Sequence, residues 1–240
     1  MAADDPHLLT FILRQRGLNF APGEDWSYST SGYELLKEIV ARTSGLSFAD
    51  FTRTRLFEPL GMRSTEYRED MRADLENLAL AYQRDGDGFR VDMMLGNARG
   101  GGALLSNPTD LLIWHEALLE GRLGAFVTER IQEPTTLNNG RELSYARALF
   151  VDSDRDGRRV WHTGGAAGYS TFLGGYPERR LAMAITCNLD GGSSRAAAPV
   201  LNLFLPPMPA AGAEAARRVR RLLRFPPPRR VESRNDDLLS

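Results

Sequence analysis

The stretch that decides the fold is PGEDWSYSTSGYELLKEIVARTSGLSFADFTRTRLFEPLGM, residues 22–62. Pro22 and Gly23 indicate an irregular loop, after which Ser31 is expected to cap a helix that Gly45 ends. The apolar face of that helix is formed by Leu35, Leu36, Ile39 and Val40. This spacing of three and four residues predicts an amphipathic helix that packs on a core.

The segments around this stretch also have helical patterns. Capping and stop residues predict four further helices, at residues 4–17, 47–61, 107–121 and 125–133. Residues 62–103 are predicted to be loops and short strands, because glycine and aspartate interrupt every apolar run there.

The second half of the chain has the pattern of an antiparallel meander. Four short segments rich in apolar residues are predicted as strands: 145–151, 158–162, 168–176 and 180–187. The sequences DRDG and PERR lie between them as hairpin turns, and a helix is expected over 193–205. The order of helices, sheet and helix predicts an α+β protein.

The composition is that of an ordinary globular domain. The chain has 240 residues, 42% hydrophobic and 25% charged, and a formal net charge of -1. Such a balance gives no field that attracts nucleic acid or an acidic membrane. A single cysteine, Cys187, excludes an internal disulfide, and the three histidines have no zinc-ligand spacing. The first residues lack the basic segment of a signal peptide, so the compartment stays unknown.

Two polar clusters are candidates for chemistry. The first covers residues 28–33, between a loop and the start of a helix, and the second covers residues 162–165, at the end of a predicted strand. Loops and strand ends on a rigid scaffold often carry functional groups. Each cluster alone is also explained by packing and capping.

Together with their surroundings, the clusters resemble the β-lactamase-related serine hydrolases, which include penicillin-binding proteins and esterases. The resemblance rests on residues 22–62, on SNPTDLLIW at 106–114 after a glycine run, and on HTGGAAGYSTFLGGYPERRLAMAITCN at 162–188. It covers about residues 5–205. It implies a β-lactamase/transpeptidase-like fold, an antiparallel sheet flanked by helices plus a helical region. Residues 1–205 would form a partial hydrolase domain, and the Pro/Arg-rich residues 206–240 a disordered tail.

The family's motifs assign roles to residues of this chain. Tyr28 matches the tyrosine that relays protons, and His162 matches the residue that orients the substrate. Thr163 and Gly164 would line the site, and the N–H group of Gly165 is the candidate donor to an oxyanion. The resemblance implies no metal and no organic cofactor.

Two departures from the family pattern stand out. Thr30 occupies the place of an asparagine and, with one hydroxyl, cannot make all of the hydrogen bonds of an amide. The Ser-x-x-Lys motif is absent, because the single lysine, Lys37, has Glu34 three positions before it. We therefore expect an N-terminally truncated chain that lacks the first strands and the nucleophile helix. Such a chain should be inactive alone, and its exposed sheet edge should favour self-association.

The substrate of the intact hydrolase stays open among small esters, β-lactams and peptides. Histidine rather than lysine at position 162 favours an esterase or peptidase. The alternative is a non-catalytic family member that serves as a binding or regulatory module. A third hypothesis gives the basic tail a role at a membrane or nucleic acid, although a solvated tail explains the same residues.

Overall fold

A computed structural model describes residues 6–68, 77–93 and 103–205. The chain divides into two compact units, Met1–Leu201 and Asn202–Ser240, and the elements described below belong to the first. The predicted tail at 206–240 lies outside the described residues. Within the described part, no helix has the length and hydropathy needed to cross a membrane.

The first part of the chain is helical, as the sequence predicts. Its helical elements are α1 (Pro6–Leu13), α2 (Thr30–Ser44), α3 (Phe48–Thr52), the π-helical turn Arg53–Phe57 and α4 (Glu58–Leu60). The last three are continuous in sequence, so the expected helix over 47–61 forms with a wider turn in its middle.

The caps of α2 correct one detail of the sequence analysis. The N-cap of α2 is Ser29 and not Ser31, because the hydroxyl of Ser29 accepts a hydrogen bond from the N–H group of Gly32 at 3.0 Å. The helix therefore begins two residues earlier than expected. Its end is as predicted, since Gly45 takes the left-handed conformation, with φ of 70°, that favours glycine.

The middle of the chain contains short strands and two helices. Their bounds are β1 (Glu66–Tyr67), β2 (Tyr82–Asp85), β3 (Gly88–Val91), β4 (Leu104–Leu105), α5 (Pro108–Leu119), α6 (Ala125–Gln132), β5 (Thr135–Thr136) and β6 (Glu142–Leu143). The strands form three antiparallel pairs, β1 with β4, β2 with β3 and β5 with β6. Asn107 caps α5 as predicted.

The predicted meander is confirmed as a four-stranded antiparallel sheet in the order β10-β9-β8-β7. Its strands are β7 (Phe150–Asp154), β8 (Gly157–Ala166), β9 (Tyr169–Tyr176) and β10 (Leu181–Cys187), and α7 (Gly192–Leu201) follows.

The position of the first strand was predicted wrongly. The sequence placed it over the apolar residues 145–151, whereas β7 covers Phe150–Asp154. The polar end of β7 is kept in the sheet by cross-strand pairs, because Asp152 and Asp154 bind side chains of β8 and β9. Tyr145 instead forms an isolated bridge with Phe150.

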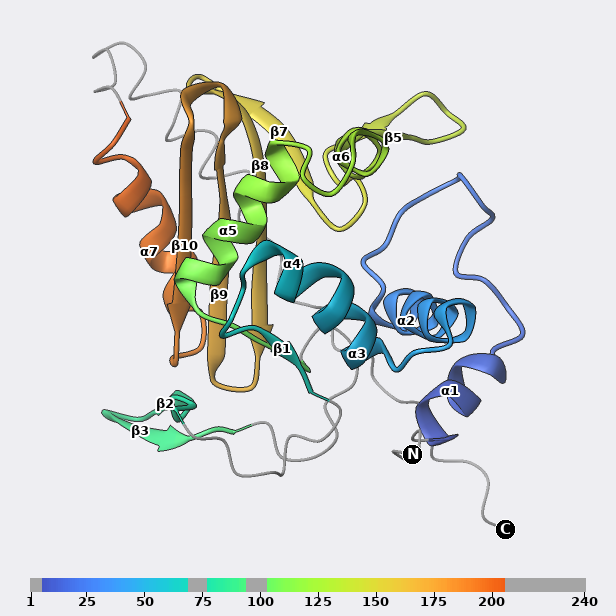
Figure 1. The fold of residues 1–240 in the computed structure, drawn as a ribbon, viewed down its shortest axis with the longest axis horizontal. Helices are drawn as coiled ribbons and strands as arrows, with labels where there is room; N and C mark the ends of the chain where they lie inside the picture. The colour runs from blue at the N-terminus through green and yellow to red at the C-terminus, as the bar shows by residue number, and fades with distance from the viewer. Residues whose placement is uncertain (1–5, 69–76, 94–102, 206–240) are drawn as a thin grey trace. The chain divides into compact units, whose positions relative to one another are not determined.

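Two helices pack against the sheet (Figure 1). Both α5 and α7 contact the strands β9 and β10. At the start of α7, Gly192 lies against the side chain of Cys187, and the N–H group of Ser193 donates to the hydroxyl of Ser170. Leu118 of α5 and Val160 of β8 are among the fully buried side chains.

The strand β10 lies at one edge of this sheet, and within the described residues it pairs with β9 alone. An unpaired strand edge can accept a strand from another chain. The fold thus contains the kind of edge that the sequence analysis expected, while the association itself stays a prediction.

Candidate active site

The loop that carries Tyr28 is held by the segment around β5 and β6. The backbone N–H group of Asn138 donates to the carbonyl of Gly23 at 2.8 Å, where Gly23 has a φ of 81°. Arg141 binds the carboxylate of Asp25 at 2.6 Å. Hydrogen bonds from the Trp26 backbone and from Arg141 lower the pKa of Asp25. The loop is therefore fixed at two points before Tyr28 enters the helix α2.

His162 lies in the middle of the sheet, on β8, where it pairs with Leu173 of β9. Its Nδ1 atom is 2.5 Å from the carbonyl oxygen of Thr163. Burial lowers the pKa of His162, and the hydrogen bond to Thr163 opposes this shift. At neutral pH the imidazole is therefore mainly uncharged.

The two candidate catalytic side chains lie side by side. The ring centroids of Tyr28 and His162 are 6.2 Å apart, and the two residues come from elements that are far apart in sequence. Tyr28 has 59% of its surface exposed, whereas His162 is half-buried. The pair therefore has one member open to solvent and one member set into the sheet.

A third residue, Tyr145, joins this pair and was missed by the sequence analysis. Its hydroxyl is 3.2 Å from Nε2 of His162, and only 6% of its surface is exposed. Burial raises the pKa of Tyr145 to about 12, with Tyr33 and Tyr28 adding to the shift. The sequence pattern gives no signal for this role, because it places Tyr145 at the start of a predicted strand.

Aromatic rings surround Tyr145 and fix its position. The ring of Trp26 lies 4.9 Å from it and that of Phe150 lies 4.8 Å from it, centroid to centroid. The ring of Tyr28 contacts it edge-on at 6.2 Å. Such tilted and edge-to-face pairs add to the stability gained by burial. We call Trp26, Tyr28, Tyr145, Phe150 and His162 the aromatic cluster.

The remaining predicted site residues differ in their placement. Thr30 is the first residue of α2 and is exposed. Thr163 contributes its carbonyl to His162, while strand alternation turns its side chain to the other face of the sheet. Gly164 and Gly165 follow on β8 and line a cavity. A Cβ atom at Gly164 would meet Oγ1 of Thr171, whereas one at Gly165 would have nothing within 4 Å.

The cavity beside β8 has a volume of about 500 Å³. Its wall includes Leu104, Leu105, Leu111, Thr171, Thr186 and Asn188. All of the described residues that line it are of uncharged types, and they include leucines of β4 and α5. The cavity therefore suits an uncharged group of a ligand that also reaches Gly164 and Gly165.

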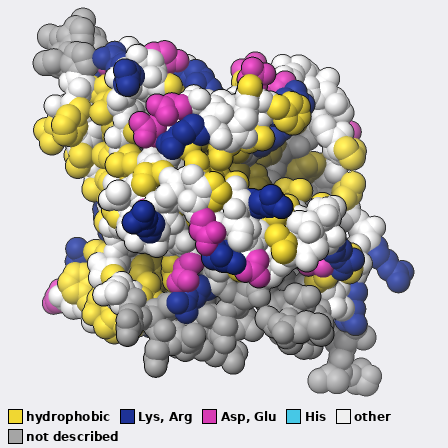
Figure 2. Space-filling model, in the orientation of Figure 1, with side chains coloured by type: hydrophobic (Ala, Val, Ile, Leu, Met, Phe, Trp, Pro, Cys, Tyr) yellow, Lys and Arg dark blue, Asp and Glu magenta, His cyan; other side chains and the backbone are white. Residues whose placement is uncertain are grey.

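Figure 2 shows basic and acidic side chains interspersed over the face that it presents. Among the described residues, no three His, Cys, Asp or Glu side chains are arranged to hold a metal ion. The features available for chemistry here are thus the aromatic cluster and the open part of β8.

The comparison with protein families gives one match over most of the chain. The beta-lactamase family matches residues 2–205. Penicillin-binding protein 4* of Bacillus subtilis is 30% identical over 199 residues, which are 75% of this chain and 44% of that protein. D-aminopeptidase of Brucella ovis is 24% identical over 208 residues, 85% of this chain and 40% of that enzyme. The chain thus spans less than half the length of these relatives.

A solved structure supports the same assignment. The octameric penicillin-binding protein homologue from Pyrococcus abyssi superposes with a TM-score of 0.66 at 25% identity, covering 76% of this chain and 43% of that one. The family consists of serine hydrolases that act by acyl transfer. From the family match and the common fold, we conclude that this chain belongs to the beta-lactamase family.

Proposed function

We propose that this chain forms the substrate-binding part of a serine hydrolase that transfers an acyl group from an ester or a peptide-like amide to water. The observation that carries the proposal is the contact between Tyr28 and His162, whose ring centroids are 6.2 Å apart. In the proposed site, Tyr28 relays the proton between the nucleophile and the leaving group. His162 borders the substrate, and Gly165 offers its N–H group to the developing oxyanion.

The pairing of β8 supports a place for the substrate. Its residues up to Trp161 pair with β7, but residues 162–166 pair with β9 alone within the described sheet. One edge of this part of β8 is therefore available to an extended ligand, which can form main-chain hydrogen bonds there. Glycine at position 165 places no side chain beside this edge, which suits the close approach of a scissile carbonyl.

Electrostatics favour a neutral ester or amide over a β-lactam. The cavity beside Gly164 and Gly165 is lined by uncharged residue types, and the pKa of His162 is lowered by burial. A substrate carboxylate would meet no full positive charge among these groups. D-aminopeptidase of Brucella ovis, a relative of this chain, supports the assignment to an amide-cleaving enzyme.

The nucleophile is the part of the mechanism that these residues do not supply. The chain has one lysine, Lys37, in an ion pair with Glu34 at 3.0 Å, and no Ser-x-x-Lys motif. We expect the 240-residue chain alone to hydrolyse p-nitrophenyl acetate no faster than the uncatalysed background, because no acyl-enzyme can form. Turnover that is lost in Tyr28→Phe would show that another residue acts as the nucleophile.

A stronger test uses a protein in which the coding sequence upstream supplies an in-frame Ser-x-x-Lys. In that protein Tyr28→Phe should lower kcat/KM for p-nitrophenyl acetate by about 100-fold or more, as loss of a proton-transfer group does. His162→Ala should also lower kcat/KM, because the ring that borders and orients the substrate is removed. Tyr82→Phe, a tyrosine of β2, is the matched control and should keep the rate. Near-normal rates in both site variants would remove the assignment.

A non-catalytic binding module is the second candidate. Two observations favour it, the threonine at position 30 and the missing Ser-x-x-Lys. An upstream sequence without that motif would support this candidate over a hydrolase. In either case, we propose that chains associate through the edge of β10, which pairs with β9 alone within the described residues. The similar penicillin-binding protein homologue from Pyrococcus abyssi is octameric. Sedimentation of a monomer at all concentrations would count against association.

A further inference from the structure

Tyr145 lies next to His162 but has no role in the mechanism proposed above. The Nδ1 atom of His162 is 2.5 Å from the carbonyl oxygen of Thr163. A carbonyl oxygen can only accept, so Nδ1 must carry a hydrogen. In a neutral imidazole the other nitrogen, Nε2, is then a bare acceptor.

Tyr145 supplies the donor for that bare nitrogen. Its hydroxyl lies 3.2 Å from Nε2, and its ring is held by Trp26 and Phe150. The phenol stays protonated through the neutral range because burial raises the pKa of Tyr145 to about 12. Among the described residues, Tyr28 and Tyr145 are ionisable groups in contact with the imidazole, and Tyr33 is close enough to Tyr145 to affect it.

We propose that Tyr145 is a positioning residue, which donates its hydroxyl hydrogen to Nε2 and, with the Thr163 carbonyl at Nδ1, holds His162 as the neutral Nδ1–H tautomer. Both ring nitrogens are then engaged within the protein. His162 would therefore border the substrate as an oriented neutral ring, with no N–H group directed at a substrate carboxylate. The link to substrate binding rests on the proposed function, whereas the tautomer and its cause do not.

Nitrogen NMR of the full chain with labelled histidine tests the proposal without any substrate. The chain has only three histidines, at positions 7, 115 and 162, so His7→Gln and His162→Gln assign the signals. In the wild-type chain we expect the His162 signals of a protonated Nδ1 and a bare Nε2. A ring with hydrogen on Nε2 would overturn the proposal.

Tyr145→Phe provides the second measurement, and it keeps the ring that packs in the aromatic cluster. Without the hydroxyl, the neutral imidazole loses a donor. The pKa of His162 should then rise by roughly half a unit to one unit, the shift that one net hydrogen bond produces. Tyr176→Phe is the matched control, since Tyr176 is equally buried and its hydroxyl binds Asp154 instead.

The outcomes separate the two proposals. A rise in the pKa of His162 in Tyr145→Phe alone supports the positioning role even if no hydrolysis is ever found. An equal rise in Tyr176→Phe would show a general effect of losing a buried hydroxyl, and an unchanged pKa in Tyr145→Phe would show that the contact has no energetic weight. Either of these results would overturn the proposal.

Discussion

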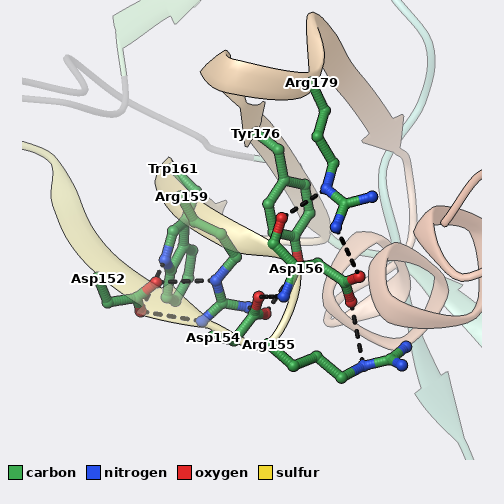
Figure 3. A network of polar contacts seen from close by, with 8 residues as sticks. All are labelled: Asp152, Asp154, Arg155, Asp156, Arg159, Trp161, Tyr176 and Arg179. Atoms are coloured by element: carbon green, nitrogen blue, oxygen red, sulfur yellow. Dashed lines mark hydrogen bonds and ion pairs between the residues drawn. The ribbon is translucent and has the colours of Figure 1, made fainter. Parts of the chain in front are cut away.

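The two ends of β8 are built in opposite ways. At the hairpin end, Arg159 binds Asp152 of β7 through two hydrogen bonds of 2.8 and 2.9 Å, and Trp161 donates to the same carboxylate at 3.2 Å. Figure 3 shows how this network continues, with Tyr176 on Asp154 and with Arg155 and Arg179 on Asp156. Polar side chains thus tie β7, β8 and β9 together at this end.

At the open end, residues 162–166 include two glycines, and among the described strands they pair with β9 alone. His162 is engaged by Tyr145 and by the Thr163 carbonyl, while a Cβ atom at Gly165 would meet nothing. One strand therefore combines a rigid half with an accessible half. Polar side chains at the hairpin end therefore anchor the strand, so that its other end can stay open to a ligand.

The largest effect on stability should come from adding a methyl group at the hairpin end. In Gly174→Ala the new Cβ would overlap the Cβ and Cα atoms of Trp161 and the carbonyl of Val160. We expect the free energy of unfolding to fall by about 2 kcal/mol, as overpacking of a core typically costs. Urea denaturation measures the change.

The matched substitution at the open end is Gly165→Ala. A methyl group there meets no atom within 4 Å, so the free energy of unfolding should stay within about 0.5 kcal/mol of wild type. Equal losses in the two alanine variants would show that the two ends do not differ in packing.

A smaller loss is expected when the polar network is broken. Asp152→Ala removes the acceptor shared by Arg159 and Trp161 and leaves the partly buried guanidinium with only the more distant carboxylate of Asp154, at 3.5 Å. We expect the free energy of unfolding to fall by about 1–2 kcal/mol. Thermal denaturation of Asp85→Ala is the control. Asp85 is well exposed and reaches Arg90 only at 4.0 Å, so its loss should change the melting temperature very little.

The smallest expected effect on the free energy of unfolding is its dependence on pH, which arises outside the hairpin end. Burial lowers the pKa of both His115 and His162, so the unfolded chain takes up protons first as the pH falls below about 6.5. The free energy of unfolding should keep its full value above that pH. It should decline as the pH falls toward the pKa values of the two histidines in the folded chain. His162→Gln should lessen the decline between pH 7 and 5 seen in denaturation. An unchanged pH profile would show that His162 does not contribute.

Much of the architecture could be predicted from local patterns. The helix that becomes α2 and its stop at Gly45, the helix α5 after Asn107, and the order of the sheet strands follow from apolar spacing and turn residues. The misplaced β7 shows the limit of such patterns. Its polar residues are strand residues because Arg159 of β8 lies opposite Asp152 and the hydroxyl of Tyr176, on β9, binds Asp154. These contacts are not visible in the segment itself.

The sequence by itself determined the family, the α+β class and the two polar clusters, because motifs and periodicity are local properties of the chain. The fold was needed to show that the ring centroids of Tyr28 and His162 are 6.2 Å apart and that the hydroxyl of Tyr145 is 3.2 Å from Nε2 of His162. The fold also shows that, within the described part of the chain, residues 162–166 pair with β9 on one side only. The physical reason is that these contacts join residues distant in sequence, and the register of strands and the anchoring of loops bring such residues together.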